Sequence, residues 1–185
     1  TRCRRRRNQG RAPSTSCRAR HRVSAAPPQV TVIGGGLAGC EAALQLARLG
    51  VPVRLAEMRP VSGSPVHRGD ALAQIVCSNS LKSTEPATAS GVLKQELDAL
   101  GCRLLDAARV CAVPAGSALA VDRDAFSLEV AGRLAAAGVT VDRGPVESLP
   151  VIADHLWLVA TGPLTSAALV EELGRVTGRP ALHFF

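Results

Sequence analysis

A chain of 185 residues, 46% of them hydrophobic, is long enough to bury a sizeable core. Aromatic residues are scarce, with three Phe, one Trp and no Tyr, which argues against nucleic-acid modules that stack bases on aromatic rings. Its apolar runs are far shorter than the roughly 20 residues that span a bilayer, so no membrane segment is expected. The formal charge of +7 comes from residues 1–28, which hold nine of the 22 Lys and Arg and none of the 15 Asp and Glu.

Residues 1–28 form an Arg-rich segment without apolar periodicity that ends in two prolines. This composition predicts a disordered tail that contributes nothing to the fold. Three interpretations remain open for it: an extension that is not native, an arm that attracts RNA phosphates, or a targeting peptide.

The six cysteines form no CxxC pair, and the four histidines do not cluster near them. No metal site is therefore predicted. No apolar secretory segment precedes the core, so the sequence predicts free thiols in a reducing cytoplasm.

The first folded segment has the pattern of a compact strand, helix and strand. Residues 29–33, QVTVI, read as a buried strand, and residues 51–57, VPVRLAE, as a second one. Between them, residues 37–50 predict a helix that ends at glycine and presents one apolar face, with Leu37, Ala43, Leu44 and Ala47. Two strands joined by a helix this way lie parallel in one sheet.

The rest of the chain continues the alternation of strands and helices. Gly, Pro and Ser dominate residues 58–70, which predicts a loop. Asp122 is placed to cap the helix that follows it. The remaining predicted elements are a helix at 91–100, extended segments around a turn at 110–123, a helix at 123–137, a strand at 139–141, a buried strand at 156–162 and a helix at 166–178. The predicted fold class is an α/β, Rossmann-like domain with a parallel sheet.

A glycine-rich turn links the first strand to the first helix and fits the pattern GxGxxG. In such a turn the first glycine permits the tight bend, the second lets a pyrophosphate approach the backbone, and the third lets helix and strand pack closely. An acid at the end of the next strand, Glu57, is placed to accept hydrogen bonds from ribose hydroxyls. The predicted dinucleotide-binding residues are Gly34, Gly35, Gly36, Leu37, Ala38, Gly39 and Glu57.

The late strand ends in LVATG, which favours FAD over NAD as the dinucleotide. A strand ending in Ala-Thr-Gly resembles a recurring element of flavoproteins with two dinucleotide sites, in which the chain passes close to FAD. Thr161 and Gly162 are therefore added to the predicted cofactor-binding residues.

Five stretches together resemble the folate- and FAD-dependent tRNA (uracil-5-)-methyltransferases: VIGGGLAGCEAA, EMRPV, VCSNSL, VPAGSALAVDR and ATGPLTS. The resemblance covers residues 29–185 and implies an FAD-binding domain that is truncated, with the rest of the fold downstream. It implies transfer of the methylene of 5,10-methylenetetrahydrofolate to C5 of a uridine in the tRNA T loop, with reduced FAD supplying electrons and NAD(P)H reducing the flavin. It also implies that residues 29–185 alone do not methylate tRNA.

Cys77 is the candidate catalytic residue, because it matches the N-terminal one of two cysteines implicated in the chemistry of the family. Uracil C5 is a poor nucleophile until a group such as a thiolate adds at C6, and an accessible thiol suits that task. Ser78, Asn79, Ser80 and Lys82 follow it and can offer polar contacts. The competing interpretation is a small buried hydrophobe, as expected for Cys40.

Two other functions stay open at the level of sequence. A related flavoprotein that modifies the tRNA wobble uridine shares GGGLAGCEAA but lacks EMRP and CSNSL. A small-molecule flavin oxidoreductase with Cys77 as a redox thiol is disfavoured by the absence of a CxxC pair.

Overall fold

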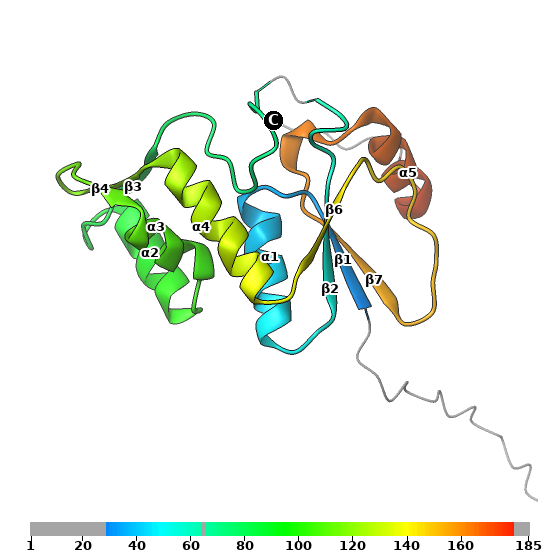
Figure 1. The fold of residues 1–185 in the computed structure, drawn as a ribbon, viewed down its shortest axis with the longest axis horizontal. Helices are drawn as coiled ribbons and strands as arrows, with labels where there is room; N and C mark the ends of the chain where they lie inside the picture. The colour runs from blue at the N-terminus through cyan, green and yellow to red at the C-terminus, as the bar shows by residue number, and fades with distance from the viewer. Residues whose placement is uncertain (1–28, 64–65, 180–185) are drawn as a thin grey trace, which may run out of the picture.

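The computed structural model describes residues 29–63 and 66–179, so the predicted Arg-rich tail at 1–28 lies outside the described residues. The centre of the fold is a parallel four-stranded sheet with helices on both sides (Figure 1). The strands run in the order β6-β2-β1-β7 and comprise β1 (Gln29–Ile33), β2 (Val53–Glu57), β6 (Thr140–Arg143) and β7 (His155–Val159). The predicted α/β class with a parallel sheet is confirmed.

Strand β1 lies inside this sheet, with β2 on one side and β7 on the other. Its side chains alternate between the two faces, as every strand requires. Val30 and Val32 pack into the main core beneath α1 (Leu37–Arg48), whereas Ile33 packs with Leu169 on the opposite face. The uninterrupted apolar run of β1 therefore reflects burial on both faces.

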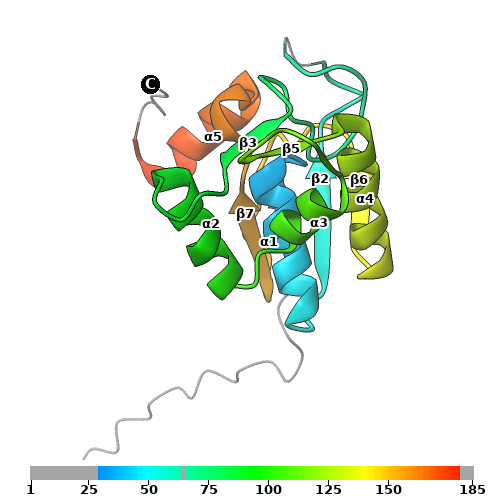
Figure 2. The same cartoon turned by 90° about the vertical axis from the view of Figure 1, so that its left-hand side faces the viewer.

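The main core lies between the sheet and α1, α3 (Arg103–Val110) and α4 (Arg123–Ala136). Asp122 caps α4 as predicted, accepting hydrogen bonds from the N–H groups of Asp124 and Ala125. The apolar positions on α4 are fully buried at Phe126, Val130 and Leu134. Figure 2 shows α1 and α3 in front of the sheet on this side.

The opposite face of the sheet is covered more thinly, by α5 (Ala167–Thr177) and a short 3-10 turn η1 (Gly162–Leu164). The prediction of a buried last strand is wrong, although not because of this face: Leu156 and Leu158 pair in register with Val30 and Val32, which face α1. In β7, Leu156 is 57% exposed and Leu158 37% exposed, because β7 is the outer strand of the described sheet.

A second sheet, antiparallel and in the order β3-β5-β4, was not predicted as a sheet. The extended segments expected at 110–123 form β4 (Ala112–Val113) and β5 (Ala118–Val121), but their partner β3 (Ser80–Ser83) comes from the segment after Cys77. Helix α2 (Ala89–Ala99) packs against β3. No described helix has the length and apolar content needed to cross a bilayer.

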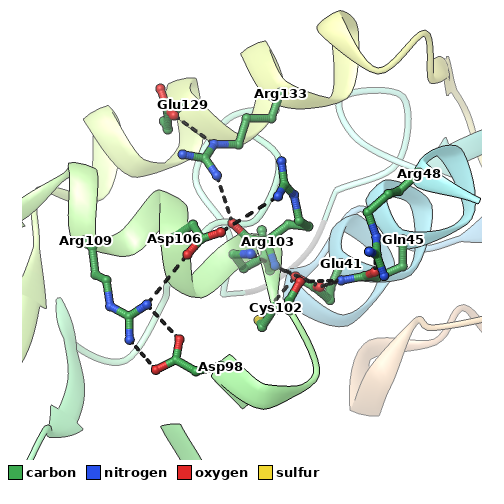
Figure 3. Close-up of polar contacts among 12 residues, drawn as sticks. Glu41, Gln45, Arg48, Asp98, Cys102, Arg103, Asp106, Arg109, Glu129 and Arg133 are labelled. Carbon is green, nitrogen blue, oxygen red and sulfur yellow. Dashed lines mark hydrogen bonds and ion pairs between the residues drawn. The ribbon is translucent and has the colours of Figure 1, made fainter. Parts of the chain in front are cut away.

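Polar contacts join α1 to α3 (Figure 3). Glu41 on α1 accepts hydrogen bonds from the N–H groups of Arg103 (3.0 Å) and Leu104 (2.8 Å), and from the Cys102 thiol (3.3 Å). Its carboxylate thus caps α3, which has no side-chain cap of its own. The same carboxylate thus also provides the acceptor for the Cys102 thiol.

Candidate functional site

The candidate site lies where β1 and β7 end side by side. The chain leaves β1 toward α1 and β2, whereas β7 pairs with the other edge of β1, so the connections diverge between these strands. In open α/β sheets, ligands bind at this divergence, beyond the carboxyl ends of the strands. The Ala160 N–H donates to the Ile33 carbonyl (2.8 Å), which holds the two strand ends together.

The glycines of the turn are required by contacts that leave no room for a side chain. A Cβ on Gly34, at φ +110°, would lie 2.6 Å from the Ala160 carbonyl oxygen. A Cβ on Gly39 would overlap the Gly34 carbonyl oxygen, so α1 can approach the turn only with glycine there. These are the roles predicted for the first and third glycines of the pattern.

Gly36 differs from those glycines, because a Cβ there would meet no atom within 4 Å. It is the N-cap of α1, and no side chain caps that helix end. The first N–H groups of a helix lack intrahelical partners and carry partial positive charge, which suits a phosphate. The open space at Gly36 and the uncapped helix end therefore fit a pyrophosphate.

Glu57 ends β2 directly beneath the turn and is only 5% exposed. Its Oε2 accepts the Gly35 N–H (2.7 Å), and its Oε1 accepts the Arg59 N–H (3.0 Å) and the Arg59 Nε–H (2.7 Å). Burial works against the charged carboxylate, but these hydrogen bonds outweigh it and lower the pKa of Glu57. A charged Glu57 therefore anchors the glycine turn to the neighbouring strand.

A cavity of about 340 Å³ opens at this place and brings together eight of the nine predicted cofactor-binding residues. Gly39 is the exception, since it is buried within α1 against Gly34. Leu37, predicted to face the core, is 39% exposed and lines the cavity, while Cys40 packs in the core instead. The eight residues lie in the turn after β1, at the start of α1, at the end of β2 and just after β7: Gly34, Gly35, Gly36, Leu37, Ala38, Glu57, Thr161 and Gly162.

Two titratable residues of the cavity, Arg59 and His67, were given no role by the sequence analysis. Arg59 belongs to the EMRP stretch and is 3% exposed beside Glu57. His67, in the loop after β2, is half-buried, and its desolvation together with the charge of Arg59 lowers its pKa. The EMRP motif was the available signal for Arg59, but the burial of its guanidinium depends on the fold.

Cys77 is exposed and does not line this cavity, although the residue before it, Val76, does. Val76 also lines a second, polar cavity of about 710 Å³ that includes Asn79. Within the described residues the Cys77 thiol has no hydrogen-bond partner, because Ser78 and Ser80 bond to the backbone of their own turn. The interpretation of Cys77 as a buried hydrophobe is wrong.

Cys40 contrasts with Cys77. It is fully buried on α1, its thiol donates to the Gly35 carbonyl (3.4 Å), and burial raises its pKa to about 12. It is therefore a core residue, as predicted. The described residues contain no cluster of three His, Cys, Asp or Glu side chains suited to a metal ion.

In the comparison with protein families, residues 29–183 match the family described as glucose inhibited division protein A. Three relatives share the name methylenetetrahydrofolate–tRNA-(uracil-5-)-methyltransferase TrmFO. The protein from Solibacter usitatus is 51% identical over 157 residues, which is 84% of this chain and 35% of the relative. The Syntrophomonas wolfei protein is 52% identical over 158 residues (85% and 36%), and the Bacillus subtilis protein 48% identical over 157 residues (84% and 35%). The resemblance stated from the sequence is thereby confirmed.

The chain spans about a third of the length of the curated relatives that it matches. Among solved structures it resembles the peptidyl tryptophan dihydroxylase QhpG, with a TM-score of 0.46 and 23% identity over 76% of this chain and 34% of that one. It also resembles FqzB, with a TM-score of 0.47 and 17% identity over 84% of this chain and 40% of that one.

Proposed function

This chain belongs to the glucose inhibited division protein A family, and on that premise we propose that it forms the FAD-binding part of an enzyme that methylates C5 of a uridine in tRNA. The observation that carries the proposal is the glycine turn, with open space at Gly36 before an uncapped helix end. We propose the activity for the full-length protein, since its relatives are about three times longer than this match.

Different residues of the site fit different parts of FAD. The N–H groups that begin α1, at Leu37 and Ala38, are placed to bind the pyrophosphate. Glu57 retains acceptor capacity on its carboxylate for a ribose hydroxyl. Thr161 and Gly162, at the end of β7, form the opposite wall of the cavity, along which the flavin half would run.

When bound and reduced, FAD supplies the electrons that turn the methylene carbon of 5,10-methylenetetrahydrofolate into a methyl group, and NAD(P)H is the proposed reductant of the flavin. The protein contributes binding and orientation: the glycine turn fixes the cofactor at the end of the sheet. The substrate would reach it from the side of Val76, which lines both cavities. We assign the enzyme to the cytoplasm, where tRNA is present and thiols stay reduced.

Cys77 is the proposed nucleophile of this chain. Its exposed thiol follows Val76 and so lies beside both cavities, where a uracil ring can approach it. A thiolate that adds to C6 of uracil makes C5 nucleophilic, and the thiol is released after C5 has gained carbon and lost its proton. Cys40, with a pKa raised to about 12 and no exposure, cannot take this role.

The test is methylation of a tRNA transcript by the full-length protein with 5,10-methylenetetrahydrofolate, FAD and NADPH, with the product mapped by mass spectrometry. We expect 5-methyluridine at one T-loop position and a yellow protein. Cys77→Ala should abolish turnover while keeping the flavin spectrum, and Cys111→Ala serves as the matched control. A colourless protein, or full activity in Cys77→Ala, would contradict the assignments of FAD and of the thiol, respectively.

A further inference from the structure

Arg59 has an unmet hydrogen bond in a buried place. Its side chain is 4% exposed and its Nε–H donates to Glu57 Oε1 at 2.7 Å. Its Nη1 is also buried, yet it has no hydrogen-bond partner among the described residues. Buried polar groups are almost always paired, and an unpaired donor on a charged group is especially costly. Such a group indicates that a partner is supplied from outside the chain.

The carboxylate of Glu57 beside it, in contrast, has a hydrogen-bond partner on each oxygen. Both oxygens of Glu57 already accept protein N–H groups, from Gly35 on one oxygen and from Arg59 on the other. The donor left over in this ion pair therefore belongs to Arg59. A ligand that completes the pair must bring an acceptor atom.

Other contacts prevent Arg59 from turning elsewhere for a partner. Its N–H and Nε–H both bond to Glu57, and its carbonyl oxygen accepts the Arg143 Nη1 hydrogen (3.1 Å). Arg143 also donates to the Asp70 carbonyl (2.7 Å), so this part of the loop is fixed to the end of β6. Arg59 and Glu57 together line the cavity at the glycine turn.

We propose that Arg59 is a ligand-binding residue of this site, whose Nη1–H donates to an acceptor atom of the adenosine half of the dinucleotide, either a ribose hydroxyl oxygen or a purine ring nitrogen. Glu57, besides its remaining capacity to accept a ribose hydroxyl, holds the guanidinium of Arg59 and the Gly35 N–H in place. The inference rests on the proposed function, because it takes the ligand to be FAD. It adds a donor to the role predicted from sequence, in which Glu57 accepts hydrogen bonds from the ribose hydroxyls.

The experiment compares Arg59→Lys with the wild type in the full-length apoprotein, by titration with FAD, ADP and FMN. Lysine keeps the positive charge beside Glu57 but loses the second donor branch. We expect affinity for FAD and ADP to fall about 10- to 100-fold, and affinity for FMN, which lacks adenosine, to stay within about twofold. The matched control is Arg54→Lys on β2, the strand that precedes the loop with Arg59; its exposed ion pair with Asp142 lies outside the cavity lining, and the variant should bind all three ligands normally.

Several results would overturn the inference. Wild-type affinity of Arg59→Lys for ADP would remove the contact, and equal losses for FMN and ADP would reduce Arg59 to a structural residue. If the variant does not fold, the affinities of the wild-type protein for FAD and FMN are compared instead. Equal affinities would mean that no residue of the site, Arg59 included, binds the adenosine half. Failure of the wild type to bind FAD at all would instead overturn the proposed function on which the inference rests.

Discussion

The glycine turn at 34–39 and the segment around Cys77 are neighbours held by different means. In the turn, contacts of Gly34 and Gly39 with backbone atoms exclude any side chain. Cys77, in contrast, is exposed and touches no hydrogen-bond partner within the described residues. The proposed cofactor turn is therefore part of the folded core, whereas the proposed nucleophile lies on a surface segment.

The surface segment is nevertheless held at both ends. Before Cys77, the Ala73 N–H donates to the Gly35 carbonyl (2.8 Å), which ties the segment to the glycine turn. After it, the Asn79 carbonyl accepts the Val121 N–H (2.9 Å), which ties it to β5. The thiol is therefore placed by backbone contacts on either side and is left accessible between them.

The largest expected effect is the difference in thiol reactivity between the two regions. Cys77 should react with iodoacetamide at least about a thousandfold faster than Cys40, which becomes accessible only when the core opens. Peptide mapping by mass spectrometry at increasing times measures both rates in one sample. Comparable rates would mean that the first helix is not packed as described.

Gly39→Ala should have the next largest effect, since its Cβ would overlap the Gly34 carbonyl oxygen. We expect a loss of about 3 kcal/mol in the free energy of unfolding, measured by denaturant titration. The matched control is Gly36→Ala, whose Cβ meets only open space. It should cost about 1 kcal/mol or less but weaken FAD binding, because the methyl group occupies the proposed position of the pyrophosphate.

Two results would contradict the roles assigned to these glycines. A stable Gly39→Ala protein would show that the turn tolerates a side chain. Unchanged FAD affinity in Gly36→Ala would place the pyrophosphate elsewhere.

Glu57→Gln should destabilise the fold by about 3 kcal/mol above pH 4.5, because it leaves the buried Arg59 guanidinium without its counter-charge. The pKa of Glu57 is lowered in the folded protein, so its charged form stabilises the fold fully above its ordinary value of 4.5. That stabilisation is lost as the pH falls through the lowered folded-state pKa. The difference in stability between the wild type and the variant, measured by thermal melts from pH 7 to pH 3, should therefore decrease only in the acid range. A difference in stability that does not change with pH would exclude a charged Glu57.

The sequence predicted those elements whose signals are local. Asp122 stands directly before the helix that it caps, and the glycine turn follows its strand, so both could be read from neighbouring residues. Helix α3 was missed because its cap, Glu41, lies 62 residues away from Arg103. The role proposed for Arg59 was missed likewise, because neither its burial nor its unpartnered Nη1 can be read from the EMRP motif.

The smallest expected effect concerns Lys94 on α2, which anchors the strand that follows Cys77. Its buried Nζ donates to the carbonyls of Leu81 (2.6 Å) and Ser83 (2.9 Å), and burial lowers its pKa. Lys94→Met should cost about 2 kcal/mol and speed hydrogen exchange of the β3 amides, while the exposed Lys82→Met should change neither. Because the glycine turn does not depend on this anchor, FAD affinity should stay at the wild-type value in both variants. If Lys94→Met lowered FAD affinity as well, the two regions would be coupled, and the division between a core-bound cofactor turn and a surface-borne thiol would fail.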